Sequence, residues 1–145
     1  MNPVVRLAPA KVNLYLKIIR KREDGYHDLA TLMQRISLYD ELIFKPANGG
    51  IVLHCPHTNL PEDTSNIVYR AAAIFLREVP FPDGIDITIK KSIPVAAGLG
   101  GGSSNAATTL MTLNELAGRP LSRTTLMEMG ASLGADVPFF ILEQT

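Results

Sequence analysis

Alternation of apolar and polar residues predicts strands in two parts of the chain. Residues 12–18 alternate over seven positions, and residues 85–90 give the clearest alternation in the sequence. Residues 4–7 predict a short first strand that ends at Pro9, because proline donates no ladder hydrogen bond. The polar residues 20–28 predict a loop.

Three further apolar segments complete the predicted strands. Residues 38–45 and 51–55 are two strands joined through the turn-rich residues 46–50, a pattern typical of a hairpin. Residues 137–142 form an uninterrupted apolar run, which we expect to be a strand that needs a partner.

Helical spacing of apolar residues predicts three helices. The first covers residues 67–78, with capping oxygens available at residues 63–65. The second is capped by Ser103 or Ser104, and the third by Ser122. Strands come early and helices are interspersed without strict alternation, so the fold class is α+β.

Composition narrows the class of function. The 145 residues suit one domain, and 14 basic and 14 acidic residues cancel to a net charge of zero. Zero charge argues against nucleic acid or an anionic membrane surface as the main partner. A single cysteine excludes an intrachain disulfide framework, and no apolar run reaches the ~20 residues of a membrane span. We expect a cytoplasmic protein that handles a small molecule.

The glycine-rich segment at residues 94–107 carries the chemical signal. A predicted strand precedes it and a predicted helix follows it, so free backbone amides at the helix start create a site for an anion such as phosphate. No lysine follows the last glycine, which excludes a P-loop, and Ser103 stands where the dinucleotide fingerprint has its third glycine.

The segment 94–107 reads PVAAGLGGGSSNAA and resembles the phosphate-binding motif of the GHMP kinases, the superfamily of galactokinase and of homoserine, mevalonate and phosphomevalonate kinases. Residues 8–14, APAKVNL, resemble its N-terminal motif. Residues 24–29, DGYHDL, and residues 134–140, GADVPFF, resemble the branch that phosphorylates a cytidine diphosphate derivative of methylerythritol.

This resemblance implies a fold and a reaction. The fold is an α+β N-terminal domain similar to the second domain of ribosomal protein S5, so residues 1–145 are the ATP-binding domain and the C-terminal domain is missing. The reaction transfers a phosphoryl group from ATP, accompanied by Mg²⁺, to a small-molecule alcohol in non-mevalonate isoprenoid precursor biosynthesis. No nucleic acid or membrane partner is expected.

The resemblance also implies roles for individual residues. A kinase needs a proton acceptor for the attacking hydroxyl and positive charge near the transferred group, and Asp136 and Lys11 match these catalytic positions. The substrate would contact Asn13, Tyr26 and His27. The ATP site would consist of the following residues: Pro94, Val95, Ala96, Ala97, Gly98, Leu99, Gly100, Gly101, Gly102, Ser103 and Ser104, together with Asn66 and Lys91 near the adenine.

Alternatives remain at this point. A zinc site at His54, Cys55 and His57 is disfavoured, because alternate side chains of one strand point to opposite faces. Magnesium is expected only with ATP, with Ser104 as a candidate ligand. A kinase of the homoserine or mevalonate type is one other interpretation, and a non-enzymatic binding module of the S5-like type is another.

Overall fold

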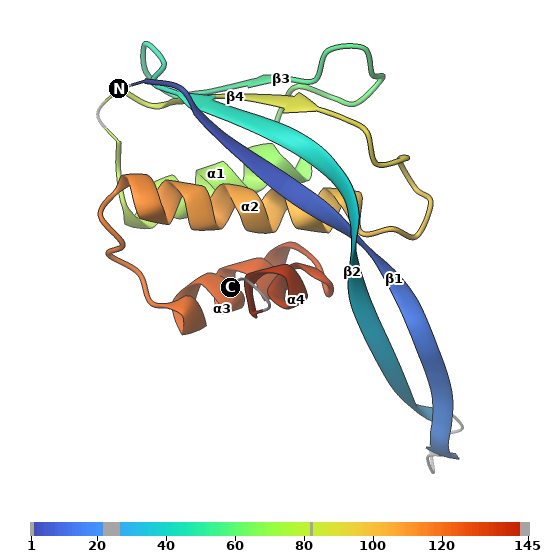
Figure 1. The fold of residues 1–145 in the computed structure, drawn as a ribbon. Coiled ribbons are helices and arrows are strands. Elements are labelled where there is room, and N and C mark those ends of the chain that lie inside the picture. Colours follow the sequence, from blue (N-terminus) through green and yellow to red (C-terminus); the bar gives the residue numbers. More distant parts are fainter. Residues whose placement is uncertain (1, 22–26, 82, 143–145) are drawn as a thin grey trace.

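A four-stranded sheet lies over two layers of helices. The computed structural model describes the backbone of residues 2–21, 27–81 and 83–142, and the side chains of these residues except 15–21 and 27–31. In Figure 1 the sheet lies above α1 and α2, and α3 and α4 lie below them. The predicted α+β class is confirmed.

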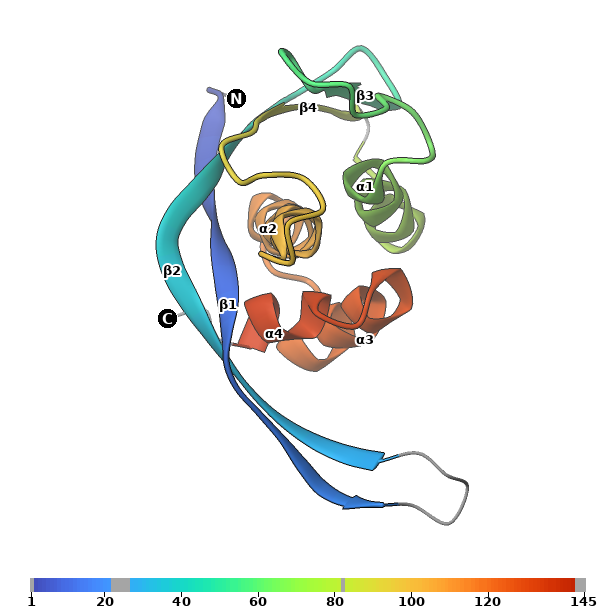
Figure 2. The same ribbon diagram turned by 90° about the vertical axis from the view of Figure 1, so that its right-hand side faces the viewer.

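The strands are β1 (Val4–Lys21), β2 (His27–Lys45), β3 (Ile51–His54) and β4 (Ile85–Lys90). They lie in the order β1-β2-β4-β3, with β2 antiparallel to both β1 and β4, and β3 parallel to β4. Figure 2 shows the β1–β2 ribbon curving around α2 and extending beyond the helices.

Several predictions about the strands were wrong. Strand β1 continues through Pro9, where a register shift between Pro9 and Ala10 accommodates the missing donor on this edge strand. Arg20 and Lys21 belong to β1 and residues 27–28 to β2, although all four were predicted to lie in a loop. Residues 46–50 do not close a hairpin, because β4 lies between β2 and β3.

The helices are α1 (Ile67–Glu78), α2 (Gly101–Leu116), α3 (Arg123–Leu133) and α4 (Val137–Leu142). The side chain of Ser122 caps α3 as predicted, whereas α1 is capped by Asn66 rather than by residues 63–65. Helix α2 begins before both predicted capping serines, with Gly100 as its N-cap.

The predicted strand over residues 137–142 is the helix α4. A short apolar run does not distinguish a strand from a buried helix by periodicity. Val137, Phe140 and Ile141 are its buried residues, which is the i, i+3, i+4 spacing of one helical face. Pro138 stands in the first turn, where its missing N–H has no intrahelical acceptor to lose.

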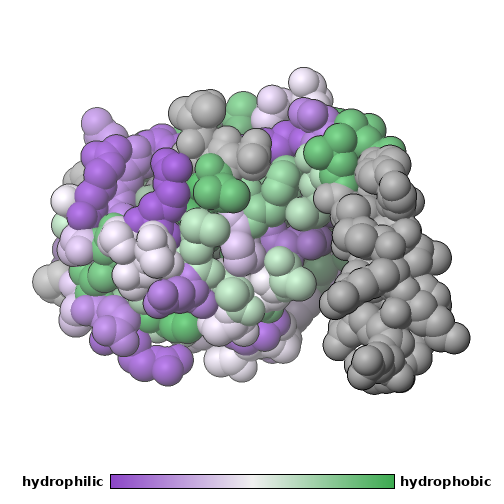
Figure 3. Space-filling model, turned by 90° about the horizontal axis from the view of Figure 1, so that it is seen from below, coloured by the Kyte–Doolittle hydropathy of each residue, from purple (hydrophilic) through white to green (hydrophobic). Residues whose placement is uncertain are grey.

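The core lies between the sheet and the helices. Leu42 and Phe44 of β2, Ile87 of β4, Phe75 of α1 and Leu110 of α2 are fully buried in one cluster. Seen from the side of α3 and α4, the surface mixes hydrophilic and hydrophobic residues (Figure 3). Among the described residues, no helix has the length and apolar character needed to cross a membrane.

Candidate functional site

A cavity of about 450 Å³ lies at the glycine-rich loop between β4 and α2. Most of the residues predicted to bind ATP line it. They are Pro94, Val95, Ala96, Ala97, Gly98, Leu99, Gly100, Gly101, Gly102 and Ser103, together with Asn66 and Lys91. These predicted ATP-binding residues therefore surround one hollow of the surface.

The start of α2 forms one wall of this cavity. The amides of the first helical turn have no intrahelical acceptors and lie at the positive end of the helix dipole. Gly100 takes a left-handed conformation, with φ of 71°. A Cβ atom at Gly100 would stand 2.9 Å from Lys11 Cγ and 3.0 Å from Phe140 Cζ, so glycine allows β1 and α4 to approach the loop closely.

Lys11 joins β1 to this loop. Its backbone amide donates to the Leu99 carbonyl oxygen at 2.8 Å. Its side chain is 6% exposed, and its ammonium nitrogen lies 3.7 Å from Asp136 Oδ2 and 3.4 Å from Asn13 Oδ1. A nearly buried ammonium needs such polar partners. The structure thus brings together the two predicted catalytic residues and one predicted substrate contact.

Asp136 stands in the short turn between α3 and α4, and its side chain is 41% exposed. Arg35 of β2 holds the middle of α4, because its guanidinium donates to the Phe140 carbonyl oxygen at 2.6 Å and lies over the Phe139 and Phe140 rings. Arg35 is also the register partner of Lys11 across β1 and β2. The same pair of strands therefore carries Lys11 and contacts the helix that follows Asp136.

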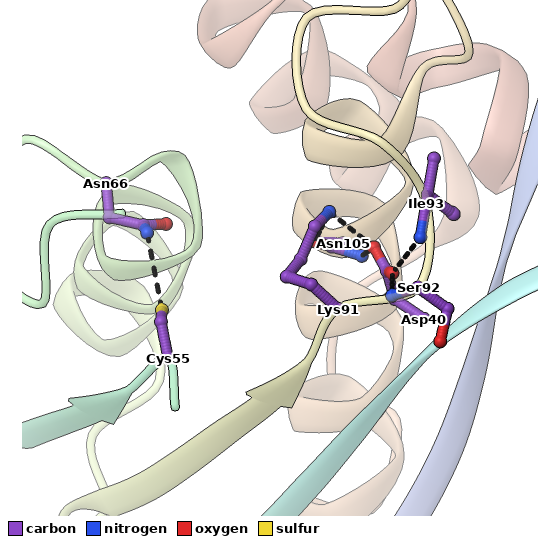
Figure 4. Close-up of polar contacts among 7 residues, drawn as sticks. All are labelled: Asp40, Cys55, Asn66, Lys91, Ser92, Ile93 and Asn105. Atoms are coloured by element: carbon purple, nitrogen blue, oxygen red, sulfur yellow. Dashed lines mark hydrogen bonds and ion pairs between the residues drawn. The ribbon is translucent and has the colours of Figure 1, made fainter. Parts of the chain in front are cut away.

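Lys91 does not present a free ammonium to the cavity. Its ammonium nitrogen donates to Asp40 Oδ2 at 2.5 Å and to Asn105 Oδ1 at 3.1 Å. Figure 4 shows Asp40, Lys91 and Asn105 converging beside the start of α2. The ammonium lies 3.1 Å from where a Cβ atom of Gly101 would stand, so its charge is next to the first helical turn.

Asn66 is likewise engaged by the protein. Its side-chain oxygen accepts from the Val68 amide at 2.9 Å, and its side-chain nitrogen donates to the Pro61 carbonyl oxygen at 2.9 Å. Figure 4 also shows its weak contact with Cys55 Sγ, at 3.8 Å. Asn66 is therefore the N-cap of α1, and it also lines the cavity.

Ser104 lies elsewhere. It is fully buried on the α2 face that borders a second cavity, between β1, α2 and α4, and its hydroxyl has no partner among the described atoms. Ser103 lines the loop cavity instead. Tyr26 falls outside the described residues, and for His27 only the backbone, at the start of β2, is described.

Sequence reasoning missed Asp40. Its carboxylate is fully buried, and Oδ1 accepts from the Ser92 and Ile93 amides at 2.6 and 2.8 Å. The sequence pattern that could have identified Asp40 is its spacing of two and four residues from Leu42 and Phe44. Alternate residues of a strand share a face, so Asp40 lies on the same face of β2 as these fully buried residues. A carboxylate at an apolar-face position needs buried partners.

Burial raises the pKa of the Cys55 thiol, and the nearby carboxylate of Glu62 raises it further. The thiol is therefore neutral and poorly nucleophilic at neutral pH. Among the described residues, His, Cys, Asp and Glu side chains form no group of three or more that could hold a metal ion.

Comparisons with known proteins agree with this geometry. The profile described as "GHMP kinases N terminal domain" matches residues 66–144. A 4-diphosphocytidyl-2-C-methyl-D-erythritol kinase of Syntrophus aciditrophicus is 62% identical over 135 residues, which cover 93% of this chain and 48% of the relative. The chain belongs to the GHMP kinase family.

Solved structures of this family share the fold. A crystal structure of 4-(cytidine 5'-diphospho)-2C-methyl-D-erythritol kinase superposes with a TM-score of 0.81 at 44% identity, covering 96% of this chain and 49% of that one. The mevalonate kinase of Methanococcus jannaschii superposes with a TM-score of 0.73 at 15% identity, covering 97% of this chain and 51% of that one, and so supports the fold alone. The chain spans about half the length of the relatives it matches.

Proposed function

We propose that this GHMP kinase chain is the ATP-binding part of an enzyme that phosphorylates the 2-hydroxyl of 4-diphosphocytidyl-2-C-methyl-D-erythritol. The reaction belongs to the non-mevalonate route to isoprenoid precursors, in the cytoplasm. Residues 1–145 act as its N-terminal domain. The observation that carries the proposal is the Lys11–Asp136 pair, because Lys11 is also hydrogen bonded to Leu99 of the glycine-rich loop.

The loop holds the triphosphate in this proposal. Amides of the first turn of α2 donate to phosphate oxygens, and the helix dipole favours their negative charge. Lys11 adds a positive charge at the same place, because its backbone is hydrogen bonded to Leu99 and its stem packs on Gly100. Positioning and charge stabilisation are what phosphoryl transfer requires of a protein.

The transfer itself uses the paired side chains. Asp136 accepts the proton of the 2-hydroxyl, whose oxygen forms a bond to the γ-phosphorus as the bond to the β–γ bridging oxygen breaks and ADP leaves. Lys11 orients the Asp136 carboxylate and stabilises the charge on the transferred group. Mg²⁺ bound to the nucleotide would neutralise phosphate charge, and it would take most of its ligands from phosphate oxygens and water rather than from protein side chains.

We assign substrate choice to Asn13, Tyr26 and His27. Asn13 lies beside Lys11 and would contact the alcohol. Tyr26 and His27 would recognise the cytosine ring by stacking and hydrogen bonding, as the resemblance implies. The high identity to a relative named for this substrate supports this assignment over homoserine or mevalonate.

The test is ADP release by the complete natural protein with Mg²⁺-ATP and one of three alcohols. We expect turnover with 4-diphosphocytidyl-2-C-methyl-D-erythritol and none above background with homoserine or mevalonate. Turnover of homoserine or mevalonate alone would move the protein to another branch of the family. ATP binding without turnover of any of the three would contradict the proposed reaction.

A further inference from the structure

We propose that Asp40 is a positioning residue for the nucleotide loop, fixing its two ends relative to each other. This role rests on the proposed function, because it gives the loop the task of holding ATP. Asp40 belongs to β2, outside the loop, and its carboxylate is fully buried.

The two oxygens of Asp40 hold opposite ends of the loop. Oδ1 accepts from the backbone amides of Ser92 and Ile93, where the chain leaves β4 for the loop. Oδ2 accepts from the side-chain nitrogen of Asn105 at 3.0 Å, one turn into α2. A single carboxylate therefore connects the entrance of residues 94–100 to the helix that follows them.

Lys91 completes the connection. Its ammonium bonds both Asp40 and Asn105, and its side chain is only 8% exposed. Charge-assisted hydrogen bonds of this kind are the strong ones, and their strength increases away from water. Lys91 and Asn105 line the loop cavity, so the arrangement of these side chains sets the shape of the wall that faces the nucleotide.

Comparing KM for ATP with KM for the alcohol distinguishes a positioning role of Asp40 from a general contribution to folding. If Asp40 acts through the loop, its loss raises KM for ATP and leaves KM for the alcohol unchanged, because Asp40 is hydrogen bonded to residues 91–93 and 105, whereas the alcohol is assigned to Asn13 and Asp136. A merely structural role would lower the amount of folded protein without altering one KM selectively.

The test begins with Asp40→Asn in the complete natural protein. The amide oxygen still accepts from Ser92 and Ile93, but the amide nitrogen faces two donors, Lys91 Nζ and Asn105 Nδ2. The direct bond from residue 40 to α2 and its ion pair with Lys91 are therefore lost, and only the Lys91–Asn105 bond remains. We expect KM for ATP to rise about tenfold with KM for the alcohol within about twofold. Hydrogen exchange should become faster at the α2 amides from Ser104 onward, which are hydrogen bonded within the helix.

The rescue variant is Asp40→Asn combined with Asn105→Asp, which exchanges the amide and the carboxylate at equal size. Lys91 then pairs with the new carboxylate, and the amide at position 40 donates to it, so KM for ATP should return to within about threefold of the parent. Asp83→Asn is the matched control, because Asp83 is exposed at the other end of β4. It should leave both KM values unchanged.

Three results would overturn the proposal. They are an unchanged KM for ATP in Asp40→Asn, an equal rise in both KM values, and no recovery in the exchanged pair. If Asp40→Asn does not fold, Asn105→Ala takes its place, because it removes the tie to α2 and leaves Asp40 paired with Lys91. Absence of ATP binding in the unmodified protein would instead overturn the proposed function, and this role with it.

Discussion

Lys11 Nζ lies 3.7 Å from Asp136 Oδ2, although the two residues stand near opposite ends of the chain. The contact depends on β1, which carries Lys11 past the glycine loop, and on the turn before α4, which carries Asp136. Gly100 allows the two segments to meet, because a side chain there would strike both Lys11 and Phe140.

Replacing Lys11 with methionine keeps the stem that packs on Gly100 and removes the charge. We expect kcat of the complete natural protein to fall about a hundredfold or more, with a much smaller change in ATP affinity, because the charge acts on the transition state. Steady-state kinetics and calorimetry measure the two quantities. A kcat within about threefold of the parent would exclude a catalytic role for Lys11.

Replacing Asp136 with asparagine keeps the shape of the turn and removes the proton acceptor. We expect kcat to fall by about a hundredfold to ten-thousandfold with little change in the melting temperature, because the side chain is 41% exposed. The double variant with Lys11→Met should be little slower than the slower single variant, since the residues act as a unit. Multiplicative losses would show that the two side chains act independently.

Replacing Gly100 with alanine should destabilise the fold by about 1–3 kcal/mol. The residue has φ of 71°, and the new Cβ atom would meet Lys11 Cγ at 2.9 Å. Gly102→Ala is the control, because its φ is not positive and its nearest contact is Ile67 Cγ2 at 3.7 Å. Urea unfolding measures both, and an equal effect of the two substitutions would contradict the packing described at Gly100.

Cys55 should react slowly with iodoacetamide at pH 8 in the folded protein and at least about tenfold faster in urea, because burial raises its pKa and hides its sulfur.

The raised pKa of Cys55 also makes the free energy of unfolding decrease as the pH rises, since above the ordinary value of 9.0 the unfolded thiol ionises before the folded one. Cys55→Ala should therefore lose less stability between pH 8 and pH 10 than the parent. Equal losses would show that Cys55 ionises alike in both states.

The elements that could be predicted are those in which local periodicity and burial agree. The alternation at residues 85–90 and the helical spacing at residues 67–78 predicted β4 and α1 with their observed bounds, because one face of each meets the core. Helix α3 follows its predicted cap, Ser122.

The elements that were missed depend on distant partners. No feature of the sequence within residues 38–55 distinguishes a hairpin of two paired strands from a sheet in which β4 lies between these strands. The run at residues 137–142 is apolar enough for either structure, and its helix is decided by packing against α2 and α3.

The arrangement of the candidate site could be predicted where a motif specifies it and only partly elsewhere. The loop, Lys11 and Asp136 came from motifs, and the structure brings them together. Ser104 was assigned to the loop, yet its helical position turns it toward the second cavity. For Asp40, the sequence indicated only that it lies on the buried face of its strand. Its partners at residues 91–93 and 105 depend on the pairing of β2 with β4, which the sequence did not predict.

A crystal structure of the complete natural protein with Mg²⁺ and a non-hydrolysable ATP analogue tests the central claim most directly. The account predicts the triphosphate on the amides of residues 101–103, with its terminal phosphoryl group facing Lys11 Nζ and Asp136 beyond it. A triphosphate bound in the second cavity, or one whose terminal phosphoryl group points away from Lys11, would contradict it.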